Sequence, residues 1–76
     1  MKKQILLASI NDVKNLVNIV NRYDFDVDLV SGRYVIDAKS IMGIFSLDLS
    51  VPIGLEANCS EDHPFWKEIA PFVVEE

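Results

Sequence analysis

Apolar and polar residues recur along the chain at two spacings, and each spacing predicts a different kind of element. Between residues 10 and 21 the apolar residues return every three to four positions, at Val13, Leu16, Val17 and Val20. This spacing predicts an amphipathic helix over residues 10–21, with one apolar stripe facing a core. Ser9 precedes the helix and Asp12 follows three residues later, a capping-box-like start in which Asp replaces the usual Glu.

Other segments alternate with a period of two or run apolar for a short distance, as β-strands do. The run over residues 4–8 predicts a first strand. Residues 24–30 predict a second strand, whose polar face carries Asp24, Asp26 and Asp28. A hairpin turn at Ser31-Gly32-Arg33 leads to a returning strand over residues 34–36. Residues 51–59 alternate most cleanly, which predicts a strand with the inward positions Val51, Ile53, Leu55, Ala57 and Cys59.

The end of the chain predicts a last helix. Ser60 or Asp62 can cap it, and Pro64 would stand in its first turn, where proline is tolerated. Pro71 would kink or end the helix. The core-facing positions would be Phe65, Ile69 and Phe72 or Val73. The resulting order, β-α-β-β-α-β-α, predicts an α+β fold in which an antiparallel sheet carries three helices on one face.

The segment over residues 39–47 follows neither spacing. Ser40 is placed to cap a helix, and the turn and a half that follows is apolar almost all the way round, at Ile41, Met42, Ile44, Phe45 and Leu47. A domain this short has little room to bury every side of such a helix. Part of it is therefore expected to form a partner-binding patch with the Ser40 hydroxyl at its edge. Gly43 lowers the intrinsic helicity by about 1 kcal/mol, which predicts a packing reason for it, such as close backbone approach.

Length and composition narrow the remaining classes. Seventy-six residues, half of them apolar, make one small domain over residues 1–76 with a packed core. The net charge of −5 argues against nucleic acid and anionic membrane surfaces as partners, because both require a basic face. No apolar run approaches the ~20 residues that span a bilayer. The single Cys59 fits a reducing compartment, so we expect a cytoplasmic protein.

Candidate catalytic and metal-binding patterns are weak. The alternating aspartates over residues 24–28 are similar to the opening of a calcium loop, but Leu29 stands where that loop needs glycine. We interpret them as an exposed carboxylate row on a strand. Cys59, His63 and the nearby acids do not reach the ligand number of a zinc site. No nucleophile–base pair or glycine-rich phosphate loop is visible, so neither an enzyme nor a cofactor-binding protein is expected.

One segment resembles HPr, the phosphocarrier protein of the bacterial sugar phosphotransferase system: Lys39-Ser40-Ile41-Met42-Gly43-Ile44-Phe45-Ser46-Leu47. The resemblance includes the order of elements, and it continues without a gap back through the hairpin over residues 26–37 to Asn21-Arg22-Tyr23-Asp24. It implies a bacterial protein with the open-faced β-sandwich of that family, in which a four-stranded antiparallel sheet carries three helices on one face.

The phosphocarrier residues of that family are absent from the corresponding positions. HPr carries phosphate on a histidine that caps its first helix, and an arginine nearby stabilises the phosphoryl charge. Counting back from Ser40 places Ser9 at the histidine position and Asn11 at the arginine position. Ser9 is no substitute, because a serine ester is not the high-energy phosphoramidate that transfer to sugar requires. The resemblance therefore implies that the phosphocarrier chemistry is lost.

His63 is the single histidine and stands next to the start of the last predicted helix, so a displaced phosphoacceptor is the alternative interpretation. In the topology that the resemblance implies, the first and last strands are antiparallel, and the helices after them begin at opposite ends of the sheet. His63 would then lie far from the usual active end, with no arginine close in sequence. A surface or capping role is the favoured interpretation.

The regulatory positions of the family are retained, by contrast. In Gram-positive bacteria a kinase phosphorylates the HPr serine that starts the second helix, and Ser40 stands at that position. The apolar docking patch of the family corresponds to Ile41, Met42 and Phe45. The resemblance implies a regulatory or adaptor protein that binds HPr kinase or a transcription regulator through this helix, with phosphate on Ser40 as a gate. Two alternatives stay open: Ser40 is only a helix cap, or the domain has no link to the phosphotransferase system.

Overall fold

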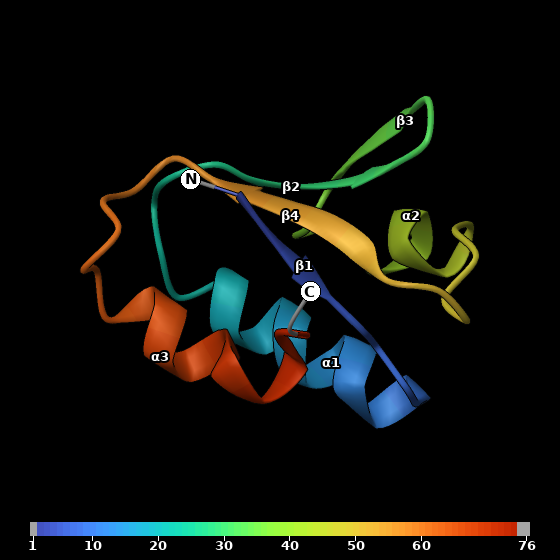
Figure 1. The fold of residues 1–76 in the computed structure, drawn as a ribbon, viewed down its shortest axis with the longest axis horizontal. Coiled ribbons are helices and arrows are strands. Elements are labelled where there is room, and N and C mark those ends of the chain that lie inside the picture. Colours follow the sequence, from blue (N-terminus) through green and yellow to red (C-terminus); the bar gives the residue numbers. More distant parts are fainter. Residues whose placement is uncertain (1, 75–76) are drawn as a thin grey trace.

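A four-stranded antiparallel sheet forms the frame of the molecule, with the strands in the order β1-β4-β2-β3 (Figure 1). Its strands are β1 (Lys2–Ile5), β2 (Val27–Ser31), β3 (Tyr34–Asp37) and β4 (Ile53–Ala57). The computed structural model describes residues 2–74, so Met1 and residues 75–76 of the expected domain lie outside the described part of the chain.

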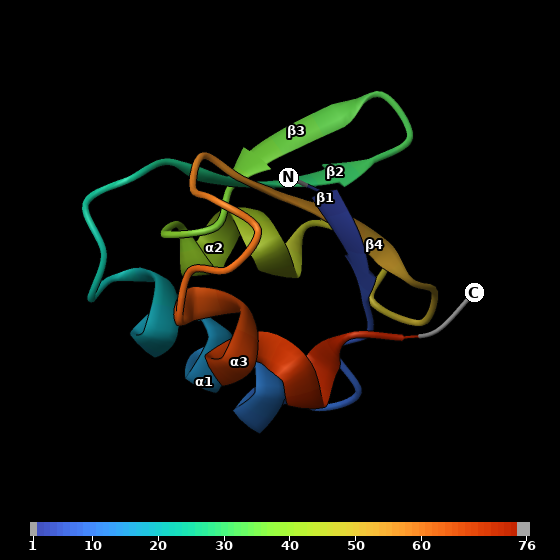
Figure 2. The same ribbon diagram turned by 60° about the vertical axis from the view of Figure 1, so that its left-hand side comes forward.

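Three helices cover one face of this sheet (Figures 1 and 2). They are α1 (Ile10–Val20), α2 (Ile41–Phe45) and α3 (Phe65–Ile69), and a short 3-10 turn, η1 (Ala70–Phe72), follows α3. The order β-α-β-β-α-β-α and the antiparallel pairing confirm the expected α+β open-faced sandwich. Within residues 2–74, no helix is long and apolar enough to cross a bilayer.

The core lies between the sheet and the helices, where the apolar stripes of both meet. Val13, Leu16 and Val20 of α1 are fully buried in one cluster with Leu29 of β2 and Leu55 of β4. Burying a side chain of this size stabilises the fold by about 1.5–3 kcal/mol before its ordering entropy is subtracted. The helix is therefore the amphipathic one that the spacing of its apolar residues predicted.

A two-residue turn joins β2 to β3. Gly32 has a φ of 58°, in the left-handed region, and Ser31 pairs with Tyr34 across the turn. Glycine at the first turn position is typical of a type II′ hairpin, whose twist matches that of the flanking strands. The predicted turn is confirmed, although Ser31 itself still belongs to β2.

The first strand is shifted from its prediction. β1 covers residues 2–5, not 4–8, because its ladder with β4 ends where Ile5 stands opposite Ile53. The next N–H, that of Leu6, donates to the Phe72 carbonyl at 2.8 Å. Leu7 is buried in the core although it lies outside the strand. Ile5 and Leu7 of the run over residues 4–8 are thus buried in the core, but only the first part of this run is a strand.

The second strand begins later than predicted, at Val27 and not at residue 24. The preceding alternation serves an aromatic cluster instead of a ladder. The Phe25 ring stacks on Tyr23 with 5.2 Å between centroids, and it meets Phe65 of α3 edge-on at 5.4 Å. These ring contacts fix the chain between α1 and β2, so an apolar residue at every second position here does not mean a strand.

The fourth strand is shorter than predicted, covering residues 53–57 instead of 51–59. Pro52 precedes it and has no N–H to add to a ladder. Val51 is 46% exposed, so its assignment to the inward face was wrong. Cys59 lies just past the strand and is half-buried, where the alternation predicted burial.

The start of the last helix also differs from the prediction. Pro64 is the residue at its N-cap, and no side chain of Ser60 or Asp62 caps it, so that assignment was wrong. The Ser60 carbonyl instead accepts a hydrogen bond from the indole N–H of Trp66 at 2.9 Å. α3 ends before Pro71, which lies in η1, so the predicted helix stop is confirmed.

Candidate functional site

Ser40 stands at the N-cap of α2, as predicted. Its backbone is extended, with φ −99° and ψ 97°, and its Oγ accepts a hydrogen bond from the Gly43 N–H at 3.3 Å. The Ser40 N–H donates to the Asp37 carbonyl at the end of β3, at 2.9 Å. The residue is exposed, so its hydroxyl is accessible from solvent.

Gly43 has the packing reason that its position predicted. A Cβ built on it would lie 2.7 Å from Cγ2 of Ile36 in β3 and 3.2 Å from Oγ of Ser40. Real Cβ atoms do not approach another carbon this closely, so only glycine lets α2 lie directly against the β3 side chain.

The apolar residues of α2 divide between the core and the solvent. Ile44 is fully buried, and Ile41 is half-buried against the core. Met42 is 78% exposed and Phe45 is 41% exposed. Met42 and Phe45 are three residues apart and therefore neighbours on the same side of the helix. We call Ser40, Ile41, Met42 and Phe45 the α2 surface; it presents two large apolar side chains next to an exposed hydroxyl.

The start of α1 holds Ser9 and Asn11, the two positions that the resemblance assigned to the phosphocarrier pair. Ser9 is the N-cap, and its Oγ accepts the Asp12 N–H at 3.2 Å. The Asp12 carboxylate accepts the N–H of Ala8, the residue before the cap, at 2.9 Å, whereas a capping box uses the N–H of the cap residue itself; the structure therefore shows the serine half of the predicted box and a bond to the preceding residue. Asn11 is exposed in the first turn. Neither Ser9 nor Asn11 supplies the imidazole or the guanidinium that histidine phosphorylation needs at this place.

His63 lies at the other end of the sheet from the start of α1. β1 and β4 are antiparallel, and α1 and α3 therefore begin at opposite ends (Figure 1). The Nδ1 atom of His63 accepts the Phe65 N–H at 3.1 Å. The imidazole also meets the rings of Tyr23 and Phe25 edge-on, at 5.4 and 5.1 Å between centroids. This is the capping role that the sequence favoured.

The sequence did not predict a polar junction formed by four side chains, those of Arg22, Tyr23, Lys39 and Glu68. The carboxylate of Glu68 in α3 accepts hydrogen bonds from the Arg22 guanidinium and from the Tyr23 hydroxyl. The Lys39 ammonium donates to the Tyr23 carbonyl at 3.0 Å. Arg22 and Glu68 are 46 residues apart, and no local pattern signals such a pair. The junction fastens the end of α1 to α3 and to the residue before Ser40.

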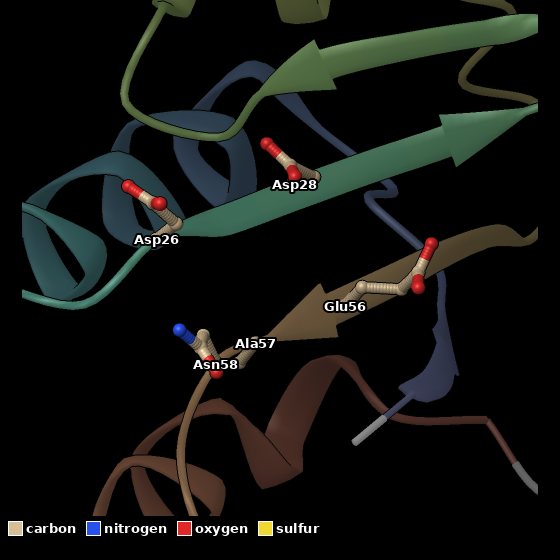
Figure 3. Close-up of a pocket in the computed structure, with 5 residues that line it drawn as sticks. All are labelled: Asp26, Asp28, Glu56, Ala57 and Asn58. Atoms are coloured by element: carbon tan, nitrogen blue, oxygen red, sulfur yellow. The ribbon is translucent and has the colours of Figure 1, made fainter.

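The opposite, outer face of the sheet carries acidic groups. Asp26, Asp28, Glu56, Ala57 and Asn58 line a pocket of about 320 Å³ there (Figure 3). Of the three predicted aspartates only Asp28 lies in β2, so the carboxylate row is shorter than predicted. No group of three histidine, cysteine or acidic residues in the described chain could hold a metal ion. Burial raises the pKa of the Cys59 thiol, which keeps it protonated at neutral pH.

Comparisons with protein-family models and with curated proteins do not identify this site. No protein-family model matches the chain, and no curated protein matches it significantly. The candidate site therefore stands on its own geometry: an exposed hydroxyl at a helix start, two exposed apolar side chains beside it, and a serine and an asparagine at the start of α1.

Proposed function

We propose that this chain is an HPr-related binding domain with a regulatory or adaptor role, and that it has no phosphocarrier activity of its own. It binds a protein partner through the α2 surface, and phosphate on Ser40 controls that binding. The carrying observation is the exposure of Met42 and Phe45 beside the Ser40 hydroxyl. Burial of both side chains would have removed the argument for docking.

Neighbouring large apolar side chains that are exposed are typical of interaction surfaces, and methionine suits such a surface because its side chain is unbranched and adaptable. An aromatic ring adds contact area at a low entropy cost. Ile44 anchors α2 in the core, so the helix presents Met42 and Phe45 from a fixed backbone. These features support a surface that is formed before the partner arrives, and preformed surfaces bind with less ordering entropy.

Phosphate on Ser40 would change the charge of this surface by about −1.5 to −2 at pH 7. The long hydrogen bond from the Gly43 N–H to Oγ leaves room for a phosphate oxygen to accept the same donor more strongly. The phosphate would lie beside Ile41 and Met42, at the rim of the apolar contact. A partner with a basic rim would gain affinity from it, and a partner with an acidic rim would lose affinity.

The gating part is tested by incubating the protein with an HPr kinase and ATP and locating phosphate by mass spectrometry. We expect one phosphate on Ser40, lost in Ser40→Ala and kept in Ser9→Ala, which is the matched cap at the other helix. Absence of phosphate, or phosphate unaffected by Ser40→Ala, contradicts the gate.

The docking part is tested by capture of partners from a bacterial lysate with the wild type, Met42→Asp and Ile10→Asp. Ile10 is 64% exposed at the start of α1, so Ile10→Asp makes a similar chemical change outside the α2 surface. A partner lost only with Met42→Asp supports docking through α2. A partner lost equally with both variants, or with neither, contradicts it.

A phosphocarrier test separates this proposal from its main rival. The protein is incubated with enzyme I of the phosphotransferase system and labelled phosphoenolpyruvate. We expect no acid-labile label, because His63 Nδ1 already accepts the Phe65 N–H and the ring is packed against two aromatic residues. Acid-labile label that disappears in His63→Ala would overturn the proposed function.

A further inference from the structure

Of the two edge strands of the sheet, β1 is covered along its outer side and β3 is open. The outer side of β1 is covered by the end of the chain: Ile5 bridges to Val73, and the Val74 N–H donates to the Gln4 carbonyl at 3.0 Å. β3 is the opposite edge strand, and no described segment runs along its outer side (Figure 2). An edge strand with free N–H and C=O groups is a template for pairing with another chain.

The direction of the β3 backbone groups follows from its ladder with β2. The Ala38 N–H donates to the Val27 carbonyl at 2.9 Å, and Ser31 and Tyr34 pair across the two-residue turn. Because backbone groups alternate in direction along a strand, those of Tyr34 and Ile36 also point toward β2. The N–H and C=O of Val35 therefore point outward, and so does the N–H of Asp37.

The side chains of β3 are exposed in a pattern that suits pairing. Tyr34 is 67% exposed and Val35 is 63% exposed, on opposite faces of the strand. Arg33 is exposed at the turn and makes no ion pair with any described residue. Asp37 stands directly opposite Asp28 of β2, and like charges in that relation are unfavourable.

We propose that β3 pairs with β3 of a second copy of this chain, antiparallel, about a two-fold axis through Val35. Val35 then exchanges two backbone hydrogen bonds with the partner's Val35, and the Asp37 N–H donates to the partner's Arg33 carbonyl. The two four-stranded sheets join into one sheet of eight strands, and the helices of both copies lie on the same face.

The register follows from backbone direction and charge together. A shift of one residue turns the free backbone groups away from each other, so only two-residue shifts are allowed. With Val35 on the axis, Arg33 stands opposite the partner's Asp37, twice by symmetry, and Tyr34 covers the partner's Ile36. A shift that puts Ile36 on the axis sets Arg33 against the partner's Lys39, a like-charge pair. The Val35 register alone matches opposite charges at both ends of the strand.

The proposal is tested by sedimentation equilibrium of the full chain at concentrations up to about 1 mM, where small interfaces associate measurably. A buffer of about 0.15 M salt screens the repulsion between two copies of charge −5 while leaving contact pairs intact. We expect a reversible monomer–dimer equilibrium. A molecular mass that stays monomeric over the whole range overturns the proposal.

Charge reversal tests the register. Arg33→Asp and Asp37→Arg each place two like-charge pairs in the interface and should weaken dimerisation about tenfold or more. An equimolar mixture of the two variants restores opposite charges in a heterodimer, so the mixture should associate while each variant alone stays monomeric. Failure of the mixture to associate, with both variants folded by circular dichroism, overturns the register.

A backbone variant tests the pairing itself. Val35→Pro removes only an N–H that points away from β2, a position at which edge strands tolerate proline. The dimer should be lost while the fold is kept. Met42→Asp is the matched control on the α2 surface and should leave the dimer intact. A dimer that survives Val35→Pro, or that Met42→Asp abolishes, uses another surface and overturns the proposal without touching the phosphate gate.

Discussion

The starts of α1 and α2 carry the same serine cap but differ in what supports it. At α1, Ser9 accepts the Asp12 N–H and the Asp12 carboxylate accepts the Ala8 N–H, so two hydrogen bonds join Asp12 to the residues at the helix start. At α2, Ser40 accepts the Gly43 N–H, and its own N–H is satisfied by a backbone carbonyl. A second side-chain hydrogen bond therefore supports the α1 cap, whereas the α2 cap consists of the bond from the Gly43 N–H to the Ser40 oxygen.

The two helices also differ in length and in their source of stability. α1 has 11 residues and a continuous buried stripe, whereas α2 has only 5. Helices shorter than about 12–15 residues are marginal alone, so tertiary packing stabilises both, and α2 depends on it completely. For α2 that packing is Ile44 in the core and Gly43 against Ile36. At both helices the serine cap therefore adds to a stability that packing already supplies.

The largest expected effect comes from removing the core anchor of each helix. Leu16→Ala in α1 and Ile44→Ala in α2 should each lower the free energy of unfolding by about 2–5 kcal/mol, because both side chains are fully buried. Urea denaturation measures both. Met42→Ala, on the exposed side of α2, should change stability by less than about 0.5 kcal/mol. A small effect of Ile44→Ala would mean that α2 is not anchored as described.

The next effect tests the close contact beneath α2. Gly43→Ala raises helix propensity by up to about 1 kcal/mol but drives a Cβ to 2.7 Å from Ile36 Cγ2, and overpacking typically costs about 1–3 kcal/mol. We expect a net destabilisation of about 1 kcal/mol in urea denaturation. In the Ile36→Ala background, where Cγ2 is absent, Gly43→Ala should become neutral or stabilising. The same cost in both backgrounds would contradict the contact.

Removing the Ser9 cap should lower the stability of the fold more than removing the Ser40 cap. Ser9→Ala removes a cap bond that the neighbouring bond from Ala8 to Asp12 supports and should cost about 1–2 kcal/mol, whereas Ser40→Ala should cost about 0.5–1 kcal/mol. Thermal or urea denaturation of both variants, side by side, gives the comparison. If Ser40→Ala costs more than Ser9→Ala, the Ser40 hydroxyl is more firmly engaged than described, which would weaken the case for its modification.

The smallest effect lies just beyond α2. The Ser50 hydroxyl and the Ser50 N–H donate to the Asp48 carboxylate at 2.6 and 3.0 Å and lower the pKa of that carboxyl. Because folding lowers this pKa, its stabilisation is present above the unfolded-state pKa and is lost as the pH falls through the folded-state pKa. An NMR titration of Ser50→Ala should show the Asp48 midpoint moving up. An unchanged midpoint would assign the shift to another cause.

Much of the fold was predictable because it depends on local spacing. The α1 stripe, the Ser9 and Ser40 caps, the Gly32 turn and the Pro71 stop are all dictated within a few residues of themselves. Strand ends were less predictable, because a strand ends where its partner ends. Val51 continues the alternation of β4 yet lies in solvent, beyond the ladder that begins at Ile53.

The candidate site was likewise predictable from the sequence only in part. The sequence indicated which helix would be too apolar to bury, and it placed a serine and an asparagine at the start of α1. The apolar pattern by itself did not indicate that Met42 and Phe45 face the solvent while Ile44 faces the core, since all sides of α2 are apolar; only the resemblance singled out the exposed pair. It also did not indicate that the Tyr23 and Phe25 rings and His63 come together, because that contact joins distant parts of the chain.

The sequence alone was enough to predict the order of the elements, the apolar stripe of α1 and both serine caps, and it shows no histidine at the start of α1. Each of these rests on the chemistry of neighbouring residues, so it can be recognised without a structure. Tertiary structure decided which side of α2 is exposed, which edge of the sheet is open and where His63 points. These features depend on which surfaces the other elements bury, and that is decided only when the whole chain packs together.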